Sequence, residues 1–323
     1  MNKIAIIGGG AFGTALAAVL ARAGNDVIQW MRDANAARAI NATHMNSARL
    51  DGVLLPDNLI ATSDLGDIQN AQAVLLVLPA QQTHSWLSEN HASIPNVPVL
   101  CCAKGIDRTT GLFQSQIATQ FCPSQNVGVL SGPGFATEIA QGMPTALTLG
   151  AQDIEIARGL QKMLSTETLR LYATNDLLGV ELGGAMKNII AIGCGVAIGA
   201  GLGQSARAAL LTRGFSEMIK LGMALGAKPE TLAGLAGLGD LTLSATSKQS
   251  RNYEMGLLLG RGEGGDTGKT TEGAYSAKVA LVLAHQHGLE LPVTATVGQL
   301  VEGEIDTRTA VKQLLNRPLG TEF

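Results

Sequence analysis

The stretch "KIAIIGGGAFGTALAAVLARAGNDVIQWMR", Lys3–Arg32, decides the fold. Its apolar run Ile4–Ile7 predicts a strand, and the alanine-rich segment Thr14–Ala23 predicts a helix that Gly24 ends. A second strand is expected over Val27–Met31. This order of elements is a βαβ unit, from which parallel sheets with helices on both faces are built.

Gly8, Gly10 and Gly13 form the pattern G-x-G-x-x-G where the first strand meets the helix. The glycines permit a tight turn and a close approach of the backbone to a pyrophosphate, and the helix N-terminus offers it free N–H groups. A structural turn without a ligand is the alternative, but the strand and the helix that the pattern requires are both expected here. The segment therefore predicts a site for NAD or NADP.

The end of the second strand bears on the choice between these two cofactors. An acidic residue there would favour NAD by bonding the hydroxyls of the adenosine ribose. Met31 occupies that position and Arg32 follows it, and an arginine can pair with the 2′-phosphate of NADP. The sequence thus favours NADP or at least its acceptance. Two alternatives stay open. Asp33, one residue further on, could favour NAD, and Arg32 could be a solvated charge at the end of the strand with no role in binding.

Four further apolar runs extend the sheet, and the segments between them are long enough for crossover helices. They are Ala73–Pro79, Val97–Gly105, Asn126–Gly134 and Pro144–Ala151. Fully apolar strands favour a parallel sheet that is covered on both faces. After Asp176 the strand signals stop and helical patterns take over. We expect a Rossmann-like, doubly wound α/β domain over residues 1–178 that binds the dinucleotide, and an all-α substrate-binding domain over residues 179–323.

The composition excludes several classes of function. Among the 323 residues, 46% are hydrophobic and 15% charged, and the formal net charge is -3. No dense basic cluster interleaved with aromatic residues is present, so nucleic acid is not an expected partner. The N-terminus lacks a secretory signal, which predicts a cytoplasmic protein. The four cysteines show no metal-ligand spacing, so buried free thiols and no metal are expected.

The 19 residues between Lys187 and Arg207 carry no charge, a length close to that of a membrane span. Five of them are glycine, however, and Asn188, Gln204 and Ser205 lie near the ends. These residues favour a buried core helix that is broken around its glycines. No integral membrane association is therefore expected.

Lys187 is the only charged residue between Leu182 and Gly203. Burial would lower the pKa of its amine toward values that suit proton transfer, which makes Lys187 a candidate catalytic residue. The alternative is a lysine at a helix end that packs only its stem and keeps its charge in water.

Several further polar residues could serve a phosphorylated substrate. Lys104 directly follows a predicted strand, and ligands of open α/β sheets bind beyond the carboxyl ends of strands. Asp240 and Ser244 are spaced by one helical turn. Three consecutive donors suited to phosphate oxygens are Ser250, Arg251 and Asn252. A capped and solvated helix start would have the same composition, so spacing alone leaves both readings open.

The chain resembles the bacterial-type NAD(P)-dependent glycerol-3-phosphate dehydrogenases along nearly its whole length. Long ordered segments carry the resemblance, among them "GGGAFGTALA", "CCAKGI", "SGPGFATEIAQGMPTA", "GVELGGAMKNIIAI", "LAGLGDLTLSATSKQSRN" and "TTEG". It implies an enzyme that interconverts dihydroxyacetone phosphate and sn-glycerol 3-phosphate with NADPH or NADH and supplies phospholipid synthesis. A homodimer is implied as well.

The resemblance also implies roles for single residues. Lys187 would donate a proton while hydride passes from the nicotinamide C4, and Asp240 and Asn188 would support it. The implied substrate-binding residues are Lys104, Gly132, Gly134, Lys187, Asp240, Ser250, Arg251 and Asn252. The implied cofactor-binding residues are Gly8, Gly10, Ala11, Phe12, Gly13, Arg32, Lys104, Ala136, Arg251, Thr270 and Glu272.

The chain departs from the family pattern at a few positions. Gly134 stands where family members commonly have a hydroxyl residue, and Ile198, Gln204 and Ser205 stand where acidic and amide residues are common. Two alternative functions stay open. One is a related β-hydroxyacid or sugar-acid dehydrogenase, and the other is a nicotinamide-binding sensor without turnover.

Overall fold

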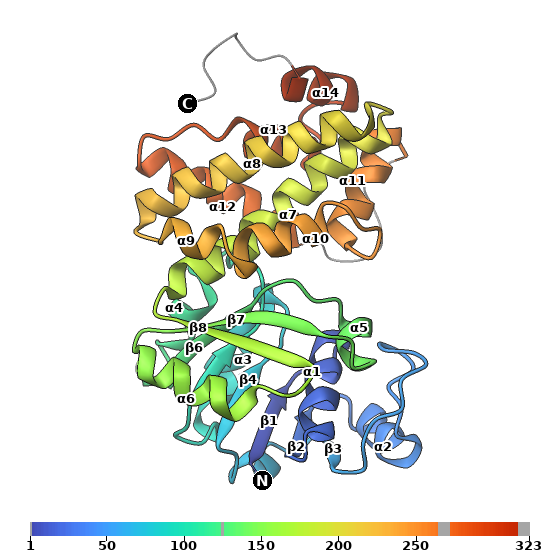
Figure 1. Ribbon diagram of the computed structural model, residues 1–323, viewed down its shortest axis with the longest axis vertical. Helices are drawn as coiled ribbons and strands as arrows, with labels where there is room; N and C mark the ends of the chain where they lie inside the picture. Colours follow the sequence, from blue (N-terminus) through green and yellow to red (C-terminus); the bar gives the residue numbers. More distant parts are fainter. Residues whose placement is uncertain (1, 124–125, 264–271, 316–323) are drawn as a thin grey trace. The chain divides into compact units, whose positions relative to one another are not determined.

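The computed structural model describes residues 2–123, 126–263 and 272–315 of the chain (Figure 1). It consists of two compact units, residues 1–104 with 112–181 and residues 105–111 with 182–323. The boundary that the sequence predicts after Leu178 lies close to this division. Residues 105–111, which the sequence assigns to the first domain, belong instead to the second unit.

The first unit is built on one eight-stranded sheet with the strand order β3-β2-β1-β4-β5-β6-β7-β8. The strands are β1 (Lys3–Ile7), β2 (Asp26–Trp30), β3 (Leu59–Thr62), β4 (Ala73–Leu76), β5 (Val99–Cys101), β6 (Val127–Ser131), β7 (Thr145–Ala151) and β8 (Leu169–Thr174). The expected α/β architecture is confirmed, and β1 lies centrally with β2 and β4 parallel to it on either side.

The prediction of a parallel sheet is wrong at one place, because β7 runs antiparallel to β6. The connection between them contains only the five-residue helix α5 (Ala136–Ala140). Five helical residues rise by about 8 Å, whereas a five-residue strand is about 17 Å long. The chain therefore does not return to the far end of the sheet, as a parallel crossover requires. β8 is again parallel to β7.

The helices of the first unit are α1 (Ala11–Arg22), α2 (Ala34–Thr43), α3 (Ala80–Asn90), α4 (Gln114–Ala118), α5 and α6 (Ile154–Leu164), with 3₁₀ turns at η1 (Leu65–Ile68) and η2 (His91–Ser93). Helix α1 begins at Ala11 rather than at the expected Thr14, because Gly10 is itself the N-cap. Apolar residues of α1, α5 and α6 form one continuous core with the strands, including Ile4, Ile6 and Leu16. This core includes residues of β1 and α1 and so fixes the two elements that flank the glycine turn.

The second unit is helical. Its elements are α7 (Leu177–Gly199, whose first five residues belong to the first unit), α8 (Gly203–Leu225), α9 (Pro229–Leu232), the π-helix η4 (Leu235–Gly239), α10 (Asp240–Ser244), α11 (Arg251–Arg261), α12 (Glu272–Gln286), α13 (Pro292–Val301) and α14 (Thr307–Leu315). The expected helix break is confirmed, since α7 ends at Gly199 and α8 begins at Gly203. Three of the four cysteines are buried and free, whereas Cys122 is only half-buried.

Helix α7 is long and apolar enough to cross a membrane, but 89% of its most apolar 18 residues are buried inside the structure. Two of its glycines explain this burial. A Cβ on Gly195 would lie 2.3 Å from the Tyr253 carbonyl oxygen, and one on Gly199 would lie 2.3 Å from that of Leu257. The backbones of α7 and α11 are therefore in direct contact, as in the core helix that the glycines predict.

Glu181, the last residue of the first unit, is a buried acid. Its oxygens accept hydrogen bonds from the Ser115 backbone N–H at 2.8 Å and from the Ser115 hydroxyl at 2.6 Å. Burial raises the pKa of the carboxyl to about 7, because low-polarity surroundings disfavour the charged form, and the hydrogen bonds from Ser115 offset only part of this effect. Glu181 thus titrates near neutral pH in the folded protein.

This titration makes the stability of the first unit depend on pH. An acid whose pKa is higher in the folded state stabilises the fold most below its unfolded pKa, here the ordinary value of 4.5, and that contribution is lost as pH rises through about 7. Glu181→Gln should therefore gain up to about 3 kcal/mol relative to wild type between pH 4 and pH 8. Urea unfolding followed by tryptophan fluorescence measures this gain, because both tryptophans, Trp30 and Trp86, lie in the first unit. A stability difference that does not change with pH would contradict the assignment.

Candidate active site

The glycine turn after β1 has no room for a side chain at its tightest points. Gly8 adopts a φ of +135°, and a Cβ there would lie 2.3 Å from the Val77 carbonyl oxygen. A Cβ on Gly13 would lie 2.4 Å from the Gly8 carbonyl oxygen, whereas the space beside Gly10 is open. No side chain caps α1, and its first turn contains no acidic residue. The N–H groups of this turn are therefore suited to a pyrophosphate.

Of the two charged residues that follow β2, only Asp33 has a structural role in the described part of the chain. Asp33 caps α2, because its Oδ1 accepts hydrogen bonds from the backbone N–H groups of Asn35 at 2.8 Å and Ala36 at 3.2 Å. Arg32 is exposed and Met31 is buried. The carboxylate that would signal NAD selectivity is thus engaged in a helix cap, and the arginine stays available at the strand end.

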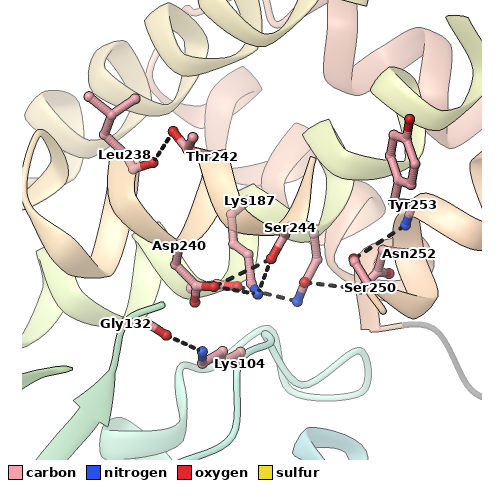
Figure 2. A network of polar contacts seen from close by, with 12 residues as sticks. Lys104, Gly132, Lys187, Leu238, Asp240, Thr242, Ser244, Ser250, Asn252 and Tyr253 are labelled. Carbon is pink, nitrogen blue, oxygen red and sulfur yellow. Dashed lines mark hydrogen bonds and ion pairs between the residues drawn. The ribbon is translucent and has the colours of Figure 1, made fainter. Parts of the chain in front are cut away.

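Lys104 lies against two of the other predicted site residues of the first unit. Its Nζ donates a hydrogen bond to the Gly132 carbonyl oxygen at 2.7 Å (Figure 2) and lies 5.8 Å from the centroid of the Phe12 ring. Gly132 has a φ of +141°, where a residue with a side chain would be strained. The carboxyl ends of β5 and β6 and the start of α1 therefore meet at Lys104.

The missing hydroxyl at position 134 has a packing explanation. A Cβ on Gly134 would lie 2.9 Å from Ile139 Cδ1 and 3.2 Å from Thr145 Cγ2, so these two side chains fill the space that a serine or threonine would need. Ala136, the predicted cofactor contact nearby, is the first residue of α5.

Lys187 lies in the interior of α7 and is paired. Its Nζ contacts Asp240 Oδ1 at 2.9 Å and Ser244 Oγ at 2.7 Å, and Ser244 Oγ lies 3.3 Å from the same carboxylate oxygen (Figure 2). Lys187 is 8% exposed and Asp240 1%. The reading of Lys187 as a side chain that keeps its charge in water is therefore wrong. The buried carboxylate stabilises the ammonium form, which is the form that can donate a proton. We call Lys187, Asp240 and Ser244 the lysine cluster.

Glycines bring the elements of the lysine cluster together. A Cβ on Gly183 would lie 2.6 Å from the Ala236 carbonyl oxygen and 2.9 Å from Gly237 Cα. The backbones of α7 and η4 therefore touch one helical turn before Lys187. The π-helix runs directly into α10, whose first residue is Asp240. The spacing of Ser244 from Asp240 in the sequence indicates that the two side chains are neighbours, but neither the spacing nor the resemblance assigns Ser244 to Lys187.

The other predicted residues of the second unit lie at the starts of α11 and α12. Asn252 is buried and its Nδ2 donates to Asn188 Oδ1 at 3.0 Å. Ser250 is the N-cap of α11, because its Oγ accepts from the Tyr253 backbone N–H at 3.4 Å (Figure 2). Arg251 follows it and is exposed. Glu272 is the first residue of α12, whereas the predicted cofactor contact Thr270 lies outside the described residues.

The described parts of the chain contain no group of three or more histidine, cysteine or acidic side chains that could hold a metal ion. A glycine turn suited to a dinucleotide and a buried lysine paired with a carboxylate are the features of a nicotinamide-dependent dehydrogenase. The fold, the glycine turn and the lysine cluster thus define the class of the protein.

Comparisons with known proteins define the family. Residues 3–157 match the model of the NAD-dependent glycerol-3-phosphate dehydrogenase N-terminus, and residues 176–312 match that of the C-terminus. The chain therefore belongs to the NAD-dependent glycerol-3-phosphate dehydrogenase family and is an NAD(P)-dependent oxidoreductase, which confirms the resemblance.

Individual relatives agree along the whole chain. The glycerol-3-phosphate dehydrogenase [NAD(P)+] of Rhodospirillum rubrum is 46% identical over 100% of this chain and 94% of the relative, and that of Ruegeria sp. is 47% identical over 99% and 100%. The crystal structure of glycerol-3-phosphate dehydrogenase from Coxiella burnetii has a TM-score of 0.91 at 36% identity and covers 98% of this chain and 99% of its own. A D-mandelate dehydrogenase shares the fold alone, at 16% identity and a TM-score of 0.66 over 96% of this chain and 99% of its own.

Proposed function

We propose that this protein reduces dihydroxyacetone phosphate to sn-glycerol 3-phosphate with NADPH or NADH and thereby supplies glycerophospholipid synthesis. The observation that carries the proposal is the lysine cluster, a buried ammonium with a carboxylate at 2.9 Å and a hydroxyl at 2.7 Å. Fold stability alone does not explain why this ion pair is buried, because an ion pair in the interior contributes little net stability. A proton donor for a reacting oxygen does need these surroundings.

NADPH or NADH, held by the glycine turn, would supply the hydride for the C2 carbonyl carbon of the substrate. As the carbonyl π electrons move to oxygen, Lys187 Nζ gives that oxygen a proton, so the ketone becomes a secondary alcohol. Asp240 holds the ammonium in place before transfer, and the Ser244 hydroxyl at 2.7 Å can donate to the amine afterwards. Solvent then returns the proton to Lys187, which is 8% exposed.

The phosphate of the substrate would be bound by residues at the start of α11. Arg251 is exposed there and can donate to two phosphate oxygens at once, and Asn252 offers an amide nitrogen. Lys104, Gly132 and Gly134 in the first unit stay proposed substrate contacts. The proposed cofactor contacts are the glycine turn, Ala11, Phe12, Arg32, Lys104, Ala136, Arg251 and Glu272. A homodimer remains a prediction from the resemblance, and a cytoplasmic location remains a prediction from the sequence.

A hydroxyacid dehydrogenase is the alternative enzyme, and phosphate recognition distinguishes the two. Oxidation of NADPH and of NADH by the purified protein should proceed with dihydroxyacetone phosphate and not with 3-carbon or 4-carbon keto acids. Turnover of a keto acid with none of dihydroxyacetone phosphate would establish the alternative. Cofactor binding without turnover of any of these substrates would point to a sensor, which the intact Lys187–Asp240 pair argues against.

Arg32→Ala tests whether Arg32 binds the 2′-phosphate of NADPH. The KM for NADPH should rise by about tenfold or more, because one charge-assisted pair is lost, while the KM for NADH should stay within about twofold. Arg38→Ala is the control, since Arg38 is another exposed arginine but lies on α2 with its guanidinium at Asn35. Equal losses for both cofactors would show that Arg32 does not distinguish them.

A further inference from the structure

A relay of hydrogen bonds joins the start of α12 to α7 through two buried asparagines. The Gly273 backbone N–H donates to Asn252 Oδ1 at 3.1 Å, and Asn252 Nδ2 donates to Asn188 Oδ1 at 3.0 Å. Asn188 Nδ2 then donates to the Gly184 carbonyl oxygen at 3.3 Å. The relay thus begins at a backbone donor and ends at a backbone acceptor.

These two ends fix the direction of both side-chain amides. A backbone N–H can only donate and a backbone carbonyl can only accept, so Asn252 must direct its oxygen to Gly273 and its nitrogen to Asn188. One hydrogen of Asn252 Nδ2 is used in the relay, and the second has no partner among the described residues. Asn252 therefore presents a donor and no acceptor, which suits the oxygens of a phosphate.

Gly273 is the residue on which this orientation depends. A Cβ at this position would lie 2.8 Å from the Asn188 carbonyl carbon, 2.8 Å from its oxygen and 2.8 Å from Asn252 Oδ1. The backbone of α7 cannot yield as the end of a flexible side chain could. Any side chain would therefore move the start of α12 and break the hydrogen bond to Asn252.

We propose that Gly273 is a positioning residue for phosphate recognition, because its N–H and its missing Cβ hold the Asn252 amide with the nitrogen toward the substrate. The proposal rests on the proposed function and assigns a role to a residue that touches neither the carbonyl nor the hydride. It also explains why a glycine occupies the second position of α12, directly after Glu272, where a helix-forming residue would otherwise be favoured.

Gly273→Ala tests the proposal by separating KM from kcat. The KM for dihydroxyacetone phosphate should rise about tenfold or more, as for the loss of one charge-assisted hydrogen bond, with kcat within about threefold. Gly298→Ala is the matched control, because its Cβ would lie 3.6 Å from Ala277 Cβ, an ordinary contact, and all its constants should match wild type.

A double-mutant cycle shows whether Gly273 acts through Asn252. In an Asn252→Ala background, Gly273→Ala should raise the KM for dihydroxyacetone phosphate no further, whereas a general structural role of Gly273 would raise the KM again. A wild-type KM in Gly273→Ala, or an equal further rise in the Asn252→Ala background, would overturn the proposal. If the wild-type protein does not reduce dihydroxyacetone phosphate, the proposed function itself has failed.

Asn252→Asp keeps the test decisive if Gly273→Ala does not fold. The carboxylate retains an acceptor for the Gly273 N–H but loses the donor and adds a negative charge. The KM for dihydroxyacetone phosphate should again rise at least tenfold, and a KM equal to that of wild type would overturn the claim that the relay presents a donor.

Discussion

Lys187→Ala is expected to reduce turnover of dihydroxyacetone phosphate by about a hundredfold or more, with the affinity for NADPH nearly unchanged. The reason is that the substrate oxygen loses its proton donor, and general acid catalysis contributes about this factor. The cofactor residues of the first unit are untouched by the substitution. Stopped-flow oxidation of NADPH gives the rate, and quenching of Trp30 and Trp86 fluorescence gives the affinity. Turnover equal to that of wild type would refute the mechanism.

The same variant should also be less stable, which calls for a second comparison. Removal of the lysine takes away the cation that compensates the charge of Asp240, which is only 1% exposed, and this costs about 3 kcal/mol or more. Lys187→Ala combined with Asp240→Asn should regain most of that stability and stay inactive. Lys220→Ala, at an exposed position of α8, should change neither property. Recovery of turnover in the double variant would mean that Lys187 only stabilises the fold.

Gly195→Ala is expected to destabilise the helical unit by about 3 kcal/mol or more. Its Cβ would lie 2.3 Å from the Tyr253 carbonyl oxygen and 2.9 Å from Gly256 Cα, so backbone meets backbone and α7 and α11 must separate. Urea unfolding followed by circular dichroism at 222 nm measures the loss, because most of the long helices are in this unit.

Helix propensity predicts the opposite sign for this substitution, which makes the control informative. Alanine is favoured over glycine in a helix interior by about 1 kcal/mol. Gly298→Ala, where the new Cβ meets only ordinary contacts, should therefore be neutral or slightly stabilising. If Gly195→Ala is also neutral or stabilising, the backbones of α7 and α11 are not in close contact.

Features that depend on residues adjacent in the chain can be predicted from the amino-acid sequence alone. The βαβ unit at Lys3–Trp30 follows from an apolar run, glycines and an alanine-rich helix that lie next to one another in the chain. The close contact that requires glycine at position 13 is likewise local, since it is made to the Gly8 carbonyl oxygen, whereas the one at Gly8 is made to Val77, which follows β4. The isolation of Lys187 in an apolar helix was equally visible, because it is a property of the local composition.

Contacts between residues that are distant in the chain depend on tertiary packing and are visible only in the folded structure. Asp240 pairs with Lys187 across 53 residues, and Gly273 bonds Asn252 across 21, through helix contacts that depend on glycines with no sequence signal of their own. The antiparallel direction of β7 could not be predicted from its apolar residues either. Alternation and composition indicate which faces of a strand are buried, but they do not indicate its direction. Partners and strand direction follow from how elements pack, and packing is a property of the whole folded chain.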